Sequence, residues 1–286
     1  MVKLFTDTSA NLPFALVKEH GIDVIPFSYT VNGVQAEYPD EVDFDGKAFY
    51  DAMRGGAEVN TSMINPALVA EHFEKALRDG DDVLYIGMSG GVSGTAQAAA
   101  IAAAELREKY PAAQIETVDT YAASLGEGLQ VLEAAELIRS GKSCREVYDA
   151  ILARRPHMCQ FFTVDNLAYL KRTGRISGVV ALAGTVLGIK PILRGDETGH
   201  IVQCGSARGS RRAYAELAEY FDQRALDKAS CIGIAHADNL EGTELLLGLL
   251  REKGFAGECV TVYYEPVTGA HVGPGTVALF FYGTEK

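Results

Sequence analysis

The chain has 286 residues, enough for one large domain or two ordinary ones with ample core. Its 48% hydrophobic and 22% charged residues are typical of a soluble globular protein. The formal net charge of -12 disfavours nucleic acid and anionic membrane surfaces as partners. Ten basic but only three acidic residues lie between Arg154 and Arg212. This local excess predicts a basic face, either a docking or anion-binding surface or an ordinary solvated one.

The cysteine and hydropathy patterns exclude several other classes of protein. The five cysteines form no C-x-x-C motif and have no nearby histidine pair, which predicts neither a disulfide framework nor a zinc site. The most apolar stretch, Val179 to Leu193, is interrupted by glycine, lysine and proline and is too short to span a bilayer. No signal-peptide pattern precedes the first strand. We expect a cytoplasmic protein that binds no metal and needs no cofactor.

The first half of the chain alternates predicted strands with predicted helices. A strand at Lys3–Thr8 precedes a helix over Pro13–His20, for which Asn11 is the expected cap. Asn32-Gly33 predicts a hairpin between strands at Asp23–Val31 and Val34–Tyr38. The further predicted elements are helices at 44–53, 67–78, 96–106, 122–140 and 144–154, and strands starting at 83 and 115. This alternation favours a parallel sheet covered on both faces, in a three-layer domain over residues 1–159.

The second half predicts a different sheet. Strands are expected at 161–164, 189–194, 201–204, 231–235, 259–264 and 277–282, and helices at 212–224 and 240–253. Ile189–Cys204, with Gly195 and Gly199 in its bend, is typical of an antiparallel hairpin. We therefore predict an α/β fold with a second domain over residues 160–286, built on a mixed sheet. A ligand is expected between the domains, where pockets are common.

The most informative segment is Val83–Thr95, in which an apolar strand leads through four glycines, two serines and a threonine into an Ala-rich helix. Glycines allow a close backbone approach to a ligand, and the start of a helix offers free N–H groups and a positive dipole end. Ser93 and Thr95 can add hydroxyl donors. The segment predicts a phosphate or carboxylate site, or the position of a reactive serine, although such a turn can also be purely structural.

Three known motifs can be compared with this segment. Gly94 is followed by threonine rather than lysine, which disfavours a P-loop, and the glycine spacing does not fit the dinucleotide-binding fingerprint. Gly87-Met-Ser89-Gly-Gly91 does match the G-x-S-x-G nucleophile elbow of α/β-hydrolases. A serine hydrolase using Ser89, with Asp119 and His271 as partners, is therefore the alternative function. It lacks a preceding oxyanion segment of the His-Gly-Gly-Gly type.

Other polar clusters follow predicted strands or precede helices. They are Thr6–Ser9, Asn60–Ser62, Asp119-Thr120 and a second glycine-rich loop, Thr268–Gly275, which carries His271. Each alone is typical of helix capping, but together they indicate a site built from several loops.

Read together, these segments resemble the DegV family of bacterial fatty-acid-binding proteins. The resemblance is carried, in order, by Phe5–Leu12, Thr61-Ser62, Ser89–Thr95, Leu167–Ser177, Gly188–Leu193 and Gly269–Gly275. It implies a two-domain α/β protein that holds one long-chain fatty acid between its domains and is not itself an enzyme. It also implies that a separate fatty acid kinase phosphorylates the bound lipid to an acyl phosphate for phospholipid synthesis.

The resemblance also assigns roles to individual residues. Thr61 and Ser93 would bind the carboxylate through their hydroxyls and Gly94 through its backbone N–H, while Ser62 and His271 would complete the hydrogen-bond network. After Thr61-Ser62 the family usually has Gln-Pro-Ser-Pro, whereas this chain has Met63-Ile-Asn-Pro66. This difference affects the expected shape of the loop and the preferred acyl chain.

Two further segments have expected roles beside this site. Lys171, Arg172 and Arg175 are expected either to dock the ATP-using partner or to close over the carboxylate, and Arg208, with Arg211 and Arg212, to contribute to docking. Cations at a helix C-terminus would also explain the first group. The apolar stretch Val179–Gly188 is a candidate wall for the lipid tail, although it can equally be a plain core helix.

Overall fold

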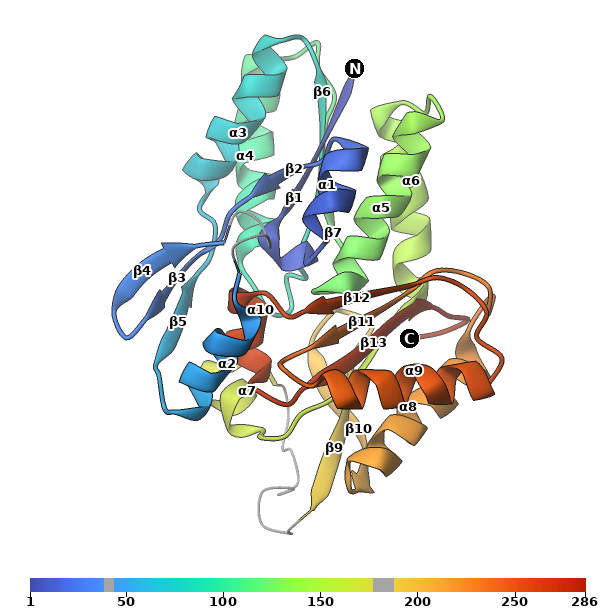
Figure 1. Cartoon of the computed structure of the whole chain (residues 1–286). Helices are drawn as coiled ribbons and strands as arrows, with labels where there is room; N and C mark the ends of the chain where they lie inside the picture. Colours follow the sequence, from blue (N-terminus) through green and yellow to red (C-terminus); the bar gives the residue numbers. More distant parts are fainter. Residues whose placement is uncertain (39–43, 177–187) are drawn as a thin grey trace.

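The computed structural model describes residues 1–38, 44–176 and 188–286. Two large β-sheets with their covering helices lie one above the other in Figure 1, and a small antiparallel sheet projects from one side. The predicted wall at 179–187 lies outside the described residues.

The first large sheet is parallel throughout, as the alternation of strands and helices predicts. Its strands lie in the order β2 (Asp23–Ile25), β1 (Val2–Asp7), β6 (Asp82–Gly87) and β7 (Ile115–Asp119). The helices α3 (Pro66–Arg78) and α4 (Thr95–Lys109) cover one face (Figure 1). The other face is covered by α1 (Phe14–His20), α5 (Leu125–Arg139) and α6 (Cys144–Arg154).

The second large sheet is mixed. Its order is β10 (Ile201–Arg208), β9 (Ile189–Gly195), β8 (Met158–Thr163), β13 (Val277–Tyr282), β11 (Ile232–His236) and β12 (Cys259–Tyr263). Only β11 and β12 pair in parallel, and the other neighbours are antiparallel. The helices α8 (Ser210–Arg224) and α9 (Leu240–Glu252) bury one face around Phe161 and Phe221. Phe162 and Phe280, on the other face, pack with Leu125 of α5, so that α5 lies between the two sheets.

The third sheet carries part of the candidate site. It has the order β4 (Val34–Glu37), β3 (Ser28–Val31) and β5 (Val59–Ser62), and the β3–β4 turn is the predicted Asn32-Gly33 hairpin. Both turn residues have positive φ, 51° and 82°, as a tight hairpin of this type requires. Three short helices lie nearby: α2 (Gly46–Arg54), α7 (Ala168–Thr173) and α10 (Pro266–Val272). Two 3-10 turns, η1 (Thr8–Ala10) and η2 (Arg155–His157), complete the described elements.

Several local predictions are wrong in instructive ways. The single strand predicted at 23–31 is divided into β2 and β3, because Pro26 between them cannot donate a backbone hydrogen bond. Asn11 does not cap α1, which begins after Pro13 without a side-chain cap. Its amide instead donates to the carbonyl oxygen of Tyr263 at 2.7 Å and accepts from the N–H of Glu265 at 2.7 Å. Asn11 therefore joins the first segment of the chain to the segment before α10.

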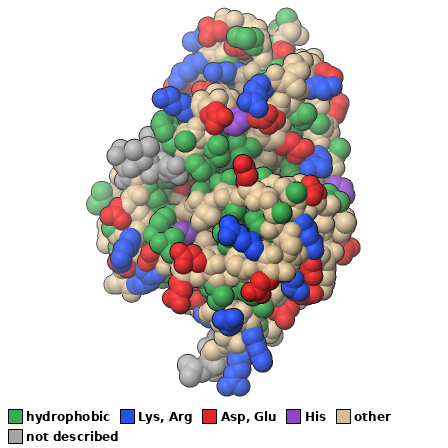
Figure 2. All heavy atoms as spheres, turned by 45° about the vertical axis from the view of Figure 1, so that its right-hand side comes forward, with side chains coloured by type: hydrophobic (Ala, Val, Ile, Leu, Met, Phe, Trp, Pro, Cys, Tyr) green, Lys and Arg blue, Asp and Glu red, His purple; other side chains and the backbone are tan. Residues whose placement is uncertain are grey.

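The surface is divided between charged and apolar regions. Lys and Arg side chains are interspersed with Asp and Glu over most of the face in Figure 2, and basic side chains gather at its lower tip. Arg208, Arg211 and Arg212 lie exposed where β10 ends and α8 begins. None of the helices in the described part of the chain is long and apolar enough to cross a membrane.

Candidate ligand-binding site

A cavity of about 270 Å³ lies where the parallel sheet, the mixed sheet and the small sheet meet. Its wall combines aliphatic and aromatic side chains with a few hydroxyls, one histidine, one arginine and one glutamine. The lining includes Phe27, Thr61, Met63, Met88, Ser89, Val92, Ser93, Gly94, Ser124, Gln160, Phe162, Leu170, Arg175, Tyr264, Thr268, His271 and Phe280. Such a wall favours a ligand that is mainly apolar and carries a polar group.

The glycine-rich segment after β6 provides one polar corner of this cavity. The helix α4 begins at Thr95 after Gly94, and no side chain of the N-cap residue bonds to its first turn. The hydroxyls of Ser93 and Thr95 lie 3.0 Å apart, and the Thr95 N–H donates to the Ser93 Oγ at 3.3 Å. The start of a helix and the Ser93 hydroxyl therefore lie at a cavity that could hold an anion, while Thr95 is buried behind them.

A second polar pair comes from elements far apart in the sequence. Thr61, on β5, and His271, in the last turn of α10, have their Oγ1 and Nε2 atoms 3.0 Å apart. Burial, together with the positive charges of Arg175 and Arg172, lowers the pKa of His271 to about 4. The imidazole is therefore neutral near pH 7. When its Nε2 carries the proton and donates to Thr61, the Thr61 hydroxyl can donate its own proton into the cavity.

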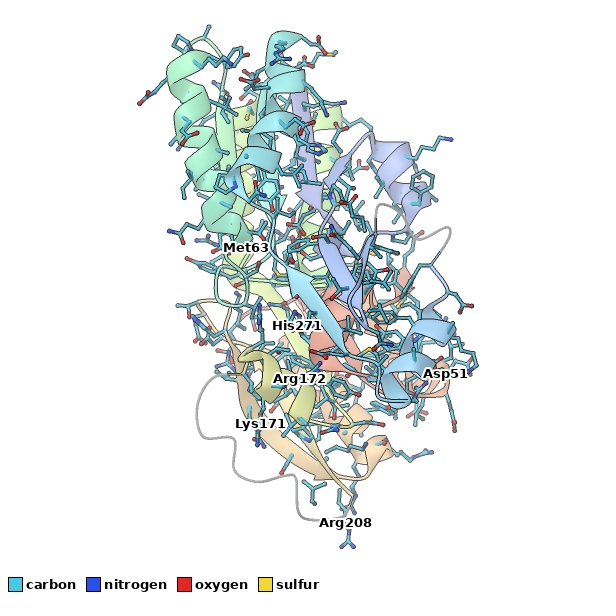
Figure 3. The ribbon with its side chains drawn as sticks, turned by 90° about the vertical axis from the view of Figure 1, so that its left-hand side faces the viewer. Asp51, Met63, Lys171, Arg172, Arg208 and His271 are labelled. Carbon is cyan, nitrogen blue, oxygen red and sulfur yellow. The ribbon has the colours of Figure 1, made fainter. Side chains whose placement is uncertain are left out.

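The basic residues of the predicted docking surface separate into two groups. Arg175 is half-buried, lines the cavity, and donates from Nε to the carbonyl oxygen of Val92 at 3.3 Å. Its two predicted roles, docking a partner and closing over an anion, stay predictions. Arg172 and Lys171 are exposed and lie below His271 in Figure 3, with Arg208 further below them. Arg172 also lies over the Tyr169 ring.

The residues after Thr61 lie outside or at the edge of the cavity. Successive side chains of a strand point to opposite faces, and Ser62 is exposed whereas Thr61 lines the cavity. Ser62 does not join the Thr61–His271 pair in the described structure, and its predicted role in the network stays a prediction. Met63, also labelled in Figure 3, is 52% exposed but lines the cavity beside Gly94.

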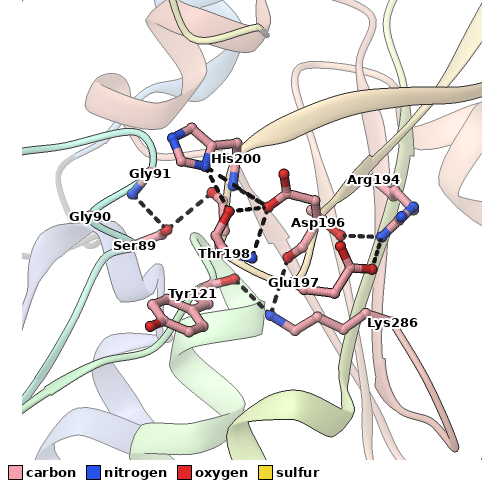
Figure 4. Close-up of polar contacts among 12 residues, drawn as sticks. Ser89, Gly90, Gly91, Tyr121, Arg194, Asp196, Glu197, Thr198, His200 and Lys286 are labelled. Carbon is pink, nitrogen blue, oxygen red and sulfur yellow. Dashed lines mark hydrogen bonds and ion pairs between the residues drawn. The ribbon is translucent and has the colours of Figure 1, made fainter.

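The three residues of the alternative hydrolase do not form a connected triad. The Ser89 hydroxyl donates to the carbonyl oxygen of Gly199 at 3.0 Å and accepts from the N–H of Gly91 at 3.0 Å (Figure 4). Asp119 accepts from the N–H groups of Gly90 and Tyr121. His271 pairs with Thr61, and no hydrogen bond joins it to Ser89 in the part of the chain that the structure describes. Ser89 therefore ties its loop to the β9–β10 turn, and this arrangement does not favour the hydrolase.

Sequence reasoning missed the helix that carries His271. Glu265 precedes it, and the buried carboxylate of Glu265 accepts from the N–H groups of Val267 and Thr268 at 2.5 and 2.7 Å and from the Thr268 hydroxyl. Burial raises the pKa of Glu265 to about 7, although these hydrogen bonds act in the opposite direction. An acidic residue directly before Pro266 was the available signal, because proline is common in the first turn of helices.

The polar cluster at Thr6–Ser9 does not line this cavity; Thr6, Asp7 and Thr8 line a separate cavity of about 230 Å³. The Ser9 hydroxyl bridges the carboxyl groups of Asp7 and Glu127, and Tyr85 donates to Asp7. All of these side chains are buried, and burial raises the pKa of both carboxyl groups. Their partners are within the protein, so this cluster fastens η1 to α5 rather than facing the ligand.

The architecture defines a class of protein: an α/β protein with one parallel sheet, one mixed sheet and an apolar cavity with polar corners where they meet. Residues 1–284 match the family described as "Uncharacterised protein, DegV family". The chain is 38% identical over 286 residues to a DegV domain-containing protein of Clostridium perfringens, covering 99% of this chain and 98% of that protein. The chain belongs to the DegV family.

Solved structures agree with this assignment. A DegV family protein from Thermus thermophilus, described as binding fatty acid, matches with a TM-score of 0.87 at 31% identity and covers 99% of each chain. DegV of Bacillus subtilis, described as a fatty acid binding protein, matches with a TM-score of 0.81 at 27% identity, covering 98% of each chain. The α/β fold predicted from the sequence, with a parallel and a mixed sheet, is confirmed.

Proposed function

We propose that this protein binds one long-chain fatty acid in the cavity, with the carboxylate at Thr61, Ser93 and Gly94. The cavity itself carries the proposal, because hydroxyls and a helix start face an otherwise largely apolar wall. The similar proteins from Thermus thermophilus and Bacillus subtilis, which are described as binding fatty acid, support it. In this proposal residues 1–159 and 160–286 are two domains that enclose the ligand.

The energetics of such a ligand suit these surroundings. Burying a methylene contributes about 0.8 kcal/mol, so ten would contribute roughly 8 kcal/mol before the cost of association. A buried carboxylate must be hydrogen-bonded, and bonds to a charged group contribute roughly 1.5–3 kcal/mol each. The tail therefore supplies most of the affinity and the polar corner fixes the orientation. Arg175 adds a positive charge beside the carboxylate position without needing to form a direct ion pair.

The protein acts in this proposal as a carrier that presents the lipid to a separate fatty acid kinase, which forms an acyl phosphate for phospholipid synthesis. The exposed cations Arg172 and Arg208, together with Arg175 at the cavity, are the proposed docking residues. A carboxylate fixed at one corner of the cavity would be offered to the kinase in one orientation. The Ser89 hydroxyl is bonded on both sides and does not serve as a nucleophile in this proposal.

Native mass spectrometry of protein freshly purified from bacteria tests the binding step. We expect a bound mass equal to a fatty acid, and a rise in melting temperature when delipidated protein receives palmitate, because a ligand at a hundred times its Kd stabilises by about 2.7 kcal/mol. Absence of both effects would refute the proposal.

A double variant tests the presentation step. Replacing both Thr61 and Ser93 by alanine removes two hydroxyls from the carboxylate position but leaves the apolar wall intact. We expect phosphorylation of the lipid by the kinase to fall more than lipid retention does. Equal losses would show that the polar corner does not mainly orient the carboxylate.

A further inference from the structure

A second polar position lies in the cavity wall at Ser124, on the connection between β7 and α5. Ser124 is only 1% exposed, and no described residue supplies a hydrogen-bond partner to its Oγ. A buried hydroxyl without a partner costs about 1–3 kcal/mol. Most residues avoid that cost by pairing, so this hydroxyl needs an explanation.

The backbone at Ser124 adds a second cost. Its φ of 53° and ψ of -142° lie in a region that residues with a side chain rarely adopt, and such strain costs about 1–3 kcal/mol. Ser124 precedes α5 as the N-cap residue, but its side chain makes no cap hydrogen bond. The first amides of α5 instead bond to backbone carbonyls of Ala123 and Ser124. Glycine would fit this backbone with less strain, so helix capping does not account for the serine.

The loop around Ser124 is held firmly in place. The Gln160 side chain, on β8, accepts from the N–H of Ala123 at 3.0 Å and donates to the carbonyl oxygen of Tyr121 at 2.9 Å. Gln160 lines the same cavity, as do the apolar side chains of Phe162 and Phe280. Ser124 is therefore a fixed residue of the wall, beside the amide of Gln160 and the apolar rings of Phe162 and Phe280.

The polar position at Ser124 is built from different elements than the proposed carboxylate position. Thr61 and His271 lie on β5 and α10, whereas Ser124 and Gln160 lie on the β7–α5 connection and on β8. A saturated acyl chain offers nothing that could pair with the Ser124 hydroxyl. A chain that carries an oxygen atom does offer such a partner.

We propose that the Ser124 hydroxyl binds an oxygen-bearing substituent, a hydroxyl or keto group, on the acyl chain of the ligand, so that the cavity favours oxygenated fatty acids. The inference rests on the proposed fatty acid binding and specifies the class of acid. A hydrogen bond to the ligand's oxygen would give the Ser124 hydroxyl the partner that it lacks among the described residues. It also gives a reason for serine, rather than glycine, at a strained position.

Competition between stearic acid and hydroxystearic acids tests this inference, with the hydroxyl placed in the middle or near the methyl end of the chain. On the delipidated wild type we expect at least one hydroxy acid to bind about threefold to tenfold more tightly than stearic acid, the range for one neutral hydrogen bond. Ser124→Ala should abolish this preference while keeping the stearate affinity within about twofold. Ser124→Gly, which also relieves the backbone strain, should do the same.

Thr163→Val is the matched control. The Thr163 hydroxyl is also buried and without a described partner, but it does not line the cavity. This variant should therefore keep the preference for the hydroxy acid. Equal affinities for all acids in the wild type, or a preference that survives in both Ser124 variants, would overturn the inference alone.

Two other outcomes have distinct meanings. A loss of stearate affinity of more than about tenfold in Ser124→Ala would place the carboxylate at Ser124 and overturn the inference. Failure of every acid to bind the wild type would overturn the proposed function together with it.

Discussion

The helices α10 and α4 both begin at the wall of the cavity, but the amide groups of their first turns are capped differently. The helix α10 has its own carboxylate, because Glu265 accepts from the N–H groups of Val267 and Thr268. The helix α4 follows Gly94 and has no cap from that residue's side chain. Hydroxyls border both starts: Thr268 at α10, and Ser93 with Thr95 at α4. Because both helix N-termini offer backbone amides and hydroxyls, we expect that the N-terminus of α4 can bind a carboxylate as that of α10 does.

The comparison shows how this protein can hold a carboxylate without an ion pair. At α10 the carboxyl group of Glu265 is bonded by two amides and one hydroxyl, all neutral groups. A fatty acid at α4 would find the same kinds of donor, and it would occupy a position that the chain fills with its own side chain elsewhere. The start of α10 is capped by the chain's own Glu265, and the start of α4 is where we propose that the ligand's carboxylate binds.

The largest expected effect comes from giving α4 a carboxylate of its own. In Gly94→Asp, the new charge would stand beside the fatty acid carboxylate, and two like charges about 4 Å apart repel by roughly 4 kcal/mol at a partly buried site. We therefore expect about a thousandfold loss of palmitate affinity, measured by titration of delipidated protein. A Cβ at Gly94 would lie 2.9 Å from the Sδ of Met63, an exposed and flexible side chain that can move.

Gly94→Asn separates charge from shape in this experiment. Asparagine caps a helix about as well as aspartate and has nearly the same size, but it carries no charge. It should cost far less affinity, about tenfold at most. Equal losses in the two variants would show that no carboxylate binds at α4.

The next largest effect is expected at the permanently capped helix. In Glu265→Ala the first amides of α10 lose their acceptor in a buried environment, and we expect a loss of about 3 kcal/mol in the free energy of unfolding. Chemical denaturation measures it. Glu146→Ala is the comparison, because Glu146 forms an exposed capping box with Ser143 and its loss should cost much less. A similar small loss in both variants would contradict the role given to Glu265.

The same carboxyl group predicts a pH dependence. Because burial raises the pKa of Glu265 from 4.5 to about 7, the folded state binds this proton more tightly than the unfolded state does. Its contribution to stability is therefore present below about pH 4.5 and is lost as the pH rises towards 7. Glu265→Gln removes the titrating group, so the stability of this variant relative to wild type should rise over that range, by up to about 3 kcal/mol. A constant difference would contradict the raised pKa.

The helix α10 also shows the limit of what the sequence predicts. Gly269, Gly273 and Gly275 made residues 268–275 look like a loop, yet the first of them lies inside the helix. A Cβ at Gly269 would come within 2.1 Å of the Tyr50 hydroxyl, so this glycine serves close packing and not a turn. A pattern of glycines does not distinguish the two uses, because the distinction depends on a residue far away in the chain.

The polar corners were predictable to different degrees. Ser93 and Thr61 were recognised because a motif and a family resemblance singled them out, and the structure places both in the cavity wall. Ser124 and Gln160 carry no such signal, since one depends on an unusual backbone conformation and the other on packing between the two sheets. Periodic hydrophobicity predicts the large elements well, whereas short polar strands such as β5 are fixed by their tertiary partners.

A smaller effect is expected at the turn that closes the cavity beside Ser89. In Figure 4 the β9–β10 turn lies against the loop after β6, and a Cβ at Gly91 would come within 2.6 Å of the Gly199 backbone. Gly91→Ala should therefore push the turn away, lower stability by about 1–3 kcal/mol and weaken lipid retention. Gly205→Ala, in the same hairpin with ordinary contacts at 3.6 Å, should do neither. Hydrogen exchange at residues 196–200 reports the displacement.

The smallest expected effect is a lack of change in the protonation of His271, which pairs with Thr61 in the cavity wall. Burial lowers the pKa of this imidazole to about 4, so it should stay neutral from about pH 5.5 to pH 8 in the free protein. NMR of the imidazole, assigned by its loss in His271→Gln, should show no titration in that range. A bound carboxylate favours the charged form, so adding palmitate should move the midpoint upward. A midpoint near 6.5 in the free protein would contradict the lowered pKa of His271.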